Sequence, residues 1–116
     1  MKKYIKIKID WLGVTVHVYF VENVVEHRNE ILLEKFPKLP KMKYSEAYAL
    51  HTYDLGYPFD HFITLNEKAH WGVIAHECFH CVNSMLEHND ISDEETTAHM
   101  LEYLVGKIQN KLENKV

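Results

Sequence analysis

The sequence predicts a small α+β domain, in which two helices pack on a sheet of about four strands. Short segments with the alternation or composition of strands fill the first two thirds of the chain, and one helix-like segment interrupts them. Two longer segments with helical periodicity follow, which gives the order β-β-α-β-β-α-α. The length of 116 residues suits one domain, so we expect one core and one site over residues 1–116.

The first two segments predict a hairpin. Residues 4–10 alternate isoleucine with polar residues, which is the period of a half-buried strand. Residues 14–21 are rich in β-branched and aromatic side chains, and Leu12-Gly13 provides the connection. Because the net charge is −4, we interpret the N-terminal lysines as the solvated side of the first strand and not as a nucleic-acid-binding patch. These lysines are Lys2, Lys3, Lys6 and Lys8.

A helix and a second pair of strands are expected next. Asn23 followed by Glu26 resembles a helix cap with its reciprocal partner. The helix should run from about Val24 to Phe36, because Pro37 stops it. Residues 37–43 form a connection rich in lysine and proline. Residues 47–55 and 61–65 flank the turn signal Gly56-Tyr57-Pro58, and this arrangement favours two strands.

The last part of the chain predicts two helices. Asn66 can cap a helix that continues through His88, and Asn89-Asp90 breaks it. Residues 92–95 open a final helix that ends near Asn114. The final helix carries an apolar stripe for packing on the core, made of Ala98, Leu101, Leu104, Val105, Ile108 and Leu112.

Composition excludes several classes of protein. No apolar run approaches eighteen residues, and the N-terminus lacks the apolar stretch of a signal peptide, so we expect a cytoplasmic protein without a membrane partner. Cys78 and Cys81 lie three residues apart within a predicted helix, which does not suit a disulfide scaffold. Both fall on the apolar side of that helix, so buried small side chains explain them better than a redox or zinc motif does.

The chemistry is carried by His76-Glu77-Cys78-Phe79-His80, which fits the pattern H-E-x-x-H. Residues four apart lie on one helical face, so both imidazoles can point at one zinc ion, while the glutamate can reach a water on the metal. With nine histidines in the chain, the same spacing also arises by chance, and the alternative is a pair of surface histidines. The pattern therefore needs support from its context.

The stretch from Trp71 to Val105 resembles the small HExxH metallopeptidase-like proteins often encoded by phages and, more distantly, the ImmA/IrrE-type metallopeptidases. The resemblance implies a minimal gluzincin-like (zincin-like) fold, with His76 and His80 as zinc ligands and Glu77 as the general base. The E-x-x-A step on the next helix falls on Glu95 to Ala98, which makes Glu95 the third ligand. The resemblance further implies a peptide or protein substrate, and a location in the host cytoplasm if the chain is phage-encoded. It also implies that the strand at residues 62–65 lies along the cleft, where its exposed edge could pair with a peptide.

Several roles stay open at this stage. Ser92 and Glu95 also fit a capping box, in which Glu95 would bind the backbone, whereas a cap at Asp93 would leave Glu95 available. Glu94 competes as the third ligand because it projects nearer the apolar stripe. His99 is a candidate transition-state donor, a partner of a ligand, an alternative ligand or a partly buried polar residue. Further candidates for stabilising an oxyanion are Tyr57, His61 and Tyr103.

The expected function is a zinc-dependent metallopeptidase-like hydrolase. The alternative is a non-catalytic, zinc-stabilised module that binds another protein, because so short a chain leaves little material for selecting a substrate. The acidic balance argues against nucleic acid as a partner, and the oligomeric state is not predicted.

Overall fold

A computed structural model describes residues 3–35, 49–56 and 59–113. The element order is strands β1 (Lys3–Ile9) and β2 (Val14–Val21), helix α1 (Val24–Lys35), strands β3 (Ala49–Gly56) and β4 (Asp60–Asn66), and helices α2 (Trp71–Glu87) and α3 (Glu94–Glu113). A 3-10 turn, η1 (Asp10–Leu12), joins β1 to β2. The predicted α+β class is confirmed.

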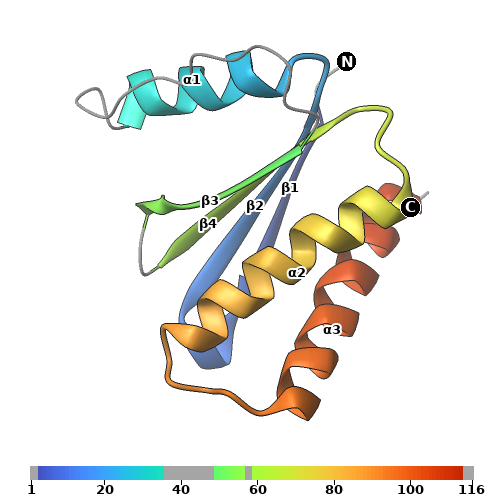
Figure 1. The fold of residues 1–116 in the computed structure, drawn as a ribbon. Helices are drawn as coiled ribbons and strands as arrows, with labels where there is room; N and C mark the ends of the chain where they lie inside the picture. Colours follow the sequence, from blue (N-terminus) through green and yellow to red (C-terminus); the bar gives the residue numbers. More distant parts are fainter. Residues whose placement is uncertain (1–2, 36–48, 57–58, 114–116) are drawn as a thin grey trace.

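The strands form one sheet in the order β1-β2-β4-β3. β1 pairs antiparallel with β2, and β3 pairs antiparallel with β4, whereas β2 and β4 run parallel at the centre. α1 lies on one side of the sheet, and α2 and α3 lie on the other (Figure 1). The molecule therefore has three layers, with the sheet in the middle.

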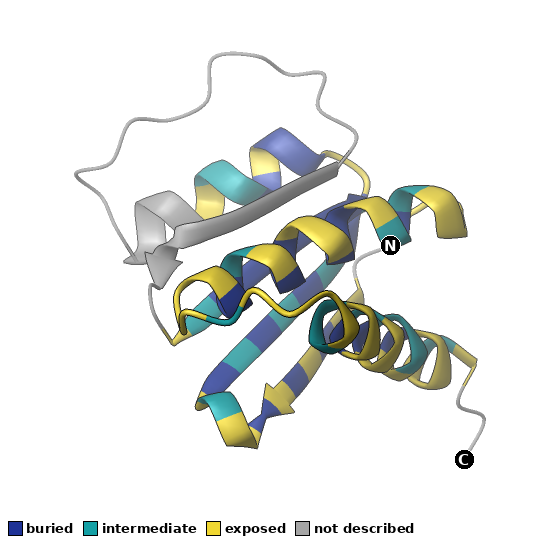
Figure 2. Ribbon diagram, turned by 60° about the horizontal axis from the view of Figure 1, so that its bottom comes forward, coloured by how far each residue is buried: buried dark blue, intermediate teal, exposed yellow. Residues whose placement is uncertain are grey.

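The core lies between the sheet and the pair of helices α2 and α3. Along β1, Ile5, Ile7 and Ile9 are buried while Lys6 and Lys8 are exposed, so the predicted alternation is confirmed. The same alternation is visible along the strands in Figure 2. The helices contribute one buried stripe each to this core: Ile74, Cys78, Cys81, Val82, Met85 and Leu86 from α2, and Met100, Leu104 and Ile108 from α3.

The hairpin turn and the first helix begin as expected. Gly13 adopts a left-handed conformation with φ of 66°, and its amide donates to the carbonyl of Asp10 at 3.1 Å, which closes η1. The amide of Glu26 donates to Asn23 Oδ1 at 2.9 Å, so Asn23 caps α1. The predicted loop at residues 37–43 lies outside the described residues, as do Tyr57 and Pro58 of the predicted turn.

The start of α2 differs from the prediction. Asn66 does not cap it: Asn66 belongs to β4, and its Oδ1 accepts from the amide of Lys68 at 2.9 Å in a local turn. α2 begins four residues later, where Nδ1 of His70 accepts from the amide of Gly72 at 3.1 Å. Histidine is an uncommon capping residue, which is why the sequence pointed to the asparagine instead.

The position of β4 also corrects the sequence analysis. The strand at residues 62–65 was expected to expose an edge to a peptide, but β4 pairs on both sides, with β2 and with β3. Its backbone is therefore committed to the sheet, and the edge strands are β1 and β3. Among the described residues, no helix is long and apolar enough to span a membrane.

Candidate metal centre

His76 and His80 lie on the outer face of α2 with their rings converging. The Nε2 atoms of the two rings are 3.1 Å apart, and the rings meet edge to face at 82° with centroids separated by 4.7 Å. The one-turn spacing explains this proximity, because side chains four residues apart are neighbours on a helix. The predicted pair of imidazoles is thus brought together with one nitrogen of each ring facing the other.

Glu77 completes the cluster from the buried side of α2. Its Oε2 lies 3.8 Å from Nε2 of His76, and its side chain is 11% exposed, against 66% for the side chain of His76. Within the described residues, His76, Glu77 and His80 form a group whose ligand atoms all lie within 4.8 Å of one another. The buried carboxylate of Glu77, beside two exposed imidazoles, can accept a proton from a molecule held between them.

The donor set and its spacing fit zinc. Zinc accepts neutral imidazole nitrogens at about 2.0–2.1 Å, and two ligands at that distance in a tetrahedral arrangement lie about 3.3 Å apart. The observed 3.1 Å between the two Nε2 atoms is close to that separation. His76 and His80 could therefore hold a zinc ion with small side-chain adjustments, and the remaining positions would need further ligands.

Helix α3 begins with a cap that leaves Glu95 available. Asp93 Oδ2 accepts from the amide of Thr96 at 2.9 Å and from its hydroxyl at 2.7 Å. These hydrogen bonds lower the pKa of Asp93. Asp93 is thus the capping residue, and the capping box from Ser92 is not formed. Glu95 lies 3.3 Å from His99, between Oε1 and Nε2, and both side chains are more than two thirds exposed.

The structure does not bring Glu94, Glu95 or His99 into the group on α2. The two glutamates belong to different faces of α3. Glu94 lies one turn before Thr97, which lines a cavity of about 420 Å³ together with Asn83 of α2. Glu94 is therefore on the side of α3 that turns towards α2.

His99 lies on the side of α3 that turns towards β1, and the exposed carboxylate of Glu95 pairs with it. His99 lines a second cavity, of about 390 Å³, together with Lys8 and Ile9 of β1, and Glu95 lies one turn before it. The prediction that Glu95 is the third ligand and that His99 assists catalysis stays a prediction. Glu94 stays the alternative ligand.

The two cysteines are parts of the core. Cys78 and Cys81 are free thiols with 0% exposure. Burial raises the pKa of Cys78 to about 12 and the pKa of Cys81 well above its ordinary value. A thiol with so high a pKa is a poor metal ligand and a poor redox group, so the interpretation as buried small side chains is confirmed.

The other candidate residues are spread over the molecule. His61 is buried in β4, with its ring centroid 6.5 Å from that of His88 at the end of α2. Tyr103 lines the cavity beside β1 together with Trp11, on the same side of α3 as His99. Tyr57 lies outside the described residues. The group on α2 does not include His61, and Tyr103 lies beside β1, so the assignment of these two residues as oxyanion donors gains no support.

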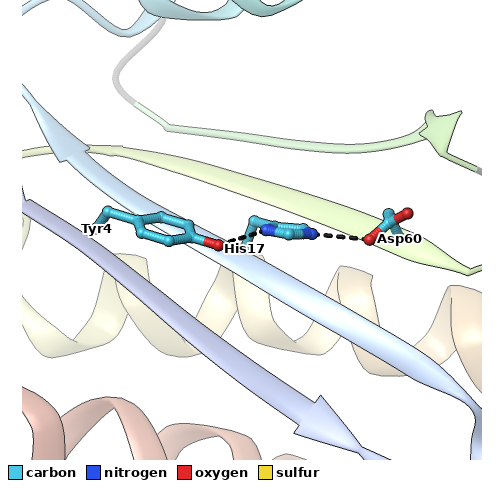
Figure 3. Close-up of polar contacts among 3 residues, drawn as sticks. All are labelled: Tyr4, His17 and Asp60. Carbon is cyan, nitrogen blue, oxygen red and sulfur yellow. Dashed lines mark hydrogen bonds and ion pairs between the residues drawn. The ribbon is translucent and has the colours of Figure 1, made fainter. Parts of the chain in front are cut away.

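One polar cluster was missed by sequence reasoning. Tyr4, His17 and Asp60 form a hydrogen-bonded chain across β1, β2 and β4 (Figure 3). The predicted hairpin could have placed Tyr4 and His17 on one face, because both alternate with buried residues. Asp60 could not have been added, since nothing in the sequence indicates that β4 lies parallel to β2.

Comparison with known proteins identifies no relative: no family model matches the chain, and no curated protein or solved structure is significantly similar to it.

Proposed function

We propose that this protein is a zinc-dependent, metallopeptidase-like hydrolase. The observation that supports the proposal is the separation of 3.1 Å between Nε2 of His76 and Nε2 of His80, with the buried carboxylate of Glu77 beside them. The H-E-x-x-H pattern and the resemblance of residues 71–105 to phage-type and ImmA/IrrE-type metallopeptidases agree with it. The third ligand would come from the first turn of α3.

Each residue of the group would have a separate task. His76 and His80 would hold zinc through Nε2. When bound, zinc would lower the pKa of a water molecule and polarise a substrate carbonyl. Glu77 would take the proton from the attacking water and pass it to the leaving amine. Its position at the buried edge of the helix restricts its rotamers, which keeps the carboxylate close to the two imidazoles.

A second function is favoured by the exposure of the site. The side chain of His76 is 66% exposed, and none of the three cavities lined by Lys3, His99 or Asn83 includes a residue of the group. A metal on an open surface also suits a module that binds another protein without cleaving it. Such a module would use zinc to fix its surface and would not need a general base.

The substitution Glu77→Gln separates the two functions. It removes the proton acceptor and keeps the shape of the side chain, so the variant should retain about one zinc per chain while its peptide cleavage falls by at least 100-fold. Zinc content is measured by elemental mass spectrometry, and cleavage with a quenched fluorescent peptide library. Glu87→Gln, on the same exposed face of α2, is the matched control and should cleave like the wild type.

Two outcomes would contradict the proposal. If the wild type folds but takes up no zinc when zinc is added, the metal centre does not exist. If wild type and Glu77→Gln bind zinc equally and bind a partner equally, with no cleavage by either, the protein is the non-catalytic module.

A further inference from the structure

A second polar site lies on the opposite face of the sheet from α2 and α3. Tyr4 Oη is 2.7 Å from Nδ1 of His17, and Nε2 of His17 is 2.8 Å from Oδ1 of Asp60. Tyr4 and His17 alternate along their strands with core residues such as Ile5 and Val16, so they face away from the core. Figure 3 shows the three side chains in line across the strands.

The hydrogen bonds assign a direction to the chain. The carboxylate of Asp60 can only accept, so Nε2 of His17 carries the hydrogen and donates it. Nδ1 of the neutral ring is then an acceptor, and the hydroxyl of Tyr4 donates to it. Asp60 thus holds His17 in the tautomer that can remove a proton from Tyr4.

Aromatic neighbours hold the rings of His17 and Tyr4 in place and leave the side chain of Tyr4 exposed in part. The ring of His17 stacks on Phe62 with centroids 4.9 Å apart, and the ring of Tyr4 stacks on Tyr19 at 4.8 Å. The side chain of His17 is 13% exposed, whereas Tyr4 is 45% exposed. A largely buried base therefore contacts the hydroxyl of a side chain that is nearly half exposed.

We propose that Tyr4 is a nucleophile towards activated acyl groups, with His17 as its base and Asp60 as the residue that positions His17. A nucleophile within hydrogen-bonding distance of a base, which is itself oriented by a third group, is the arrangement that activates hydroxyls in covalent catalysis. This site shares no residue with the metal centre, so each can be tested without the other.

The step would proceed as follows for an activated ester. Tyr4 Oη attacks the carbonyl carbon and forms an ester bond, while the bond from that carbon to the leaving alkoxide breaks. The hydroxyl proton passes to Nδ1 of His17, and the imidazolium keeps its hydrogen bond to the carboxylate of Asp60. The products are acyl-Tyr4 and the free leaving group.

The base is needed because Tyr4 does not ionise readily. Burial raises the pKa of Tyr4, and the negative charge of Asp60 raises it further. Free phenolate is therefore scarcer at Tyr4 than at an ordinary tyrosine, and the proton has to leave during the attack. Without help from His17, Tyr4 would react more slowly than other exposed tyrosines.

This contrast provides the test. The full chain is incubated with p-nitrophenyl acetate, and the acetylation rate of each tyrosine is measured by digestion and mass spectrometry. Tyr103 is the internal control, because it is 42% exposed and Tyr4 is 45% exposed. We expect Tyr4 to be acetylated at least tenfold faster than Tyr103 in the wild type.

Variants identify the source of the reactivity. His17→Gln should lower the rate at Tyr4 to that of Tyr103 or below, and Asp60→Asn should lower it at least fivefold. Glu102→Gln removes one charge from an exposed position of α3, on the other side of the sheet from the chain of hydrogen bonds, and should leave the rate unchanged. Circular dichroism checks that each variant is folded.

Wild-type protein alone can overturn the proposal. If Tyr4 is acetylated no faster than Tyr103, the three side chains only tie the strands together. The same conclusion follows if folded His17→Gln reacts at Tyr4 as fast as the wild type.

Discussion

At the scale of single residues, His61 is a histidine whose charged form the fold opposes. It is 1% exposed in the centre of the sheet. Burial lowers the pKa of His61 to about 4; the charge of His88 acts in the same direction, and Asp60 opposes it. The folded protein therefore requires a neutral imidazole at this position.

This requirement predicts a loss of stability in mild acid. The unfolded chain binds a proton at His61 below its ordinary pKa of 6.5, whereas the folded chain does so only near pH 4. The contribution of the neutral ring is complete above pH 6.5 and is lost as the pH falls from 6.5 to 4. The free energy of unfolding should fall by roughly 2–3 kcal/mol between pH 7.5 and 4.5 from this residue alone.

Urea unfolding at the two pH values measures the effect. His61→Gln removes the titrating group and should flatten the dependence on pH, even if the variant is less stable at pH 7.5. His99→Gln, on the exposed side of α3, is the control and should keep the dependence of the wild type. An unchanged slope in folded His61→Gln would show that another group is responsible.

At the scale of elements, the first turn of α3 carries the two carboxylates that are candidates for the third ligand of the proposed metal centre. Glu94 lies one turn before Thr97, on the side of α3 that turns towards α2, whereas the exposed Glu95 is already paired with His99. We therefore expect Glu94→Gln to weaken zinc binding at least tenfold and Glu95→Gln to weaken it less than threefold. Competition with a chelating dye measures both affinities.

The opposite order would favour the E-x-x-A step of the resembling families, with Glu95 as the ligand. Equal, small effects in both variants would mean that α3 supplies neither ligand. Glu102→Gln, an exposed glutamate further along the same helix, controls for the loss of one negative charge.

Much of the element structure follows from local patterns in the sequence. The alternation of isoleucine and lysine predicted β1, and the cap at Asn23 predicted the start of α1, because both depend on residues close in the chain. The predicted start of α2 was wrong by several residues, because an asparagine that forms a local turn cannot be told from a helix cap in the sequence. In a local turn and in a helix cap alike, the side-chain oxygen of asparagine accepts from a backbone amide two or three residues later.

Sequence reasoning found the group on α2 and missed the chain of Tyr4, His17 and Asp60. His76, Glu77 and His80 lie within five consecutive residues of one helix, so the spacing alone brings them together. Asp60 reaches His17 only because β4 lies parallel to β2. That pairing depends on how the whole chain packs, which no local pattern encodes.

At the scale of the whole molecule, the proposed zinc centre predicts that zinc adds to stability without being needed for folding. The core between the sheet and the helices is formed by buried side chains, and His76 projects from its outer surface. The metal-free protein should therefore keep its circular dichroism spectrum. Zinc at 100 times its dissociation constant should raise the free energy of unfolding by about 2.7 kcal/mol, because it binds only the folded state.

Thermal and urea unfolding with zinc, and with a chelator, test this expectation. The double variant His76→Ala, His80→Ala should fold as well as the metal-free wild type and gain nothing from zinc. Loss of the spectrum on chelation would instead identify zinc as a structural element of the fold.

The parallel pairing at the centre of the sheet also has a consequence for the order of folding. β1 and β2 can form their hairpin early, but Thr15 of β2 pairs with Asp60 of β4, 45 positions later (60 − 15). Closing a loop of that length costs about 3 kcal/mol of chain entropy before any contact compensates for it. During synthesis on the ribosome, one edge of the nascent hairpin therefore stays open until residue 66 has emerged, and chaperones would meet the chain at that edge.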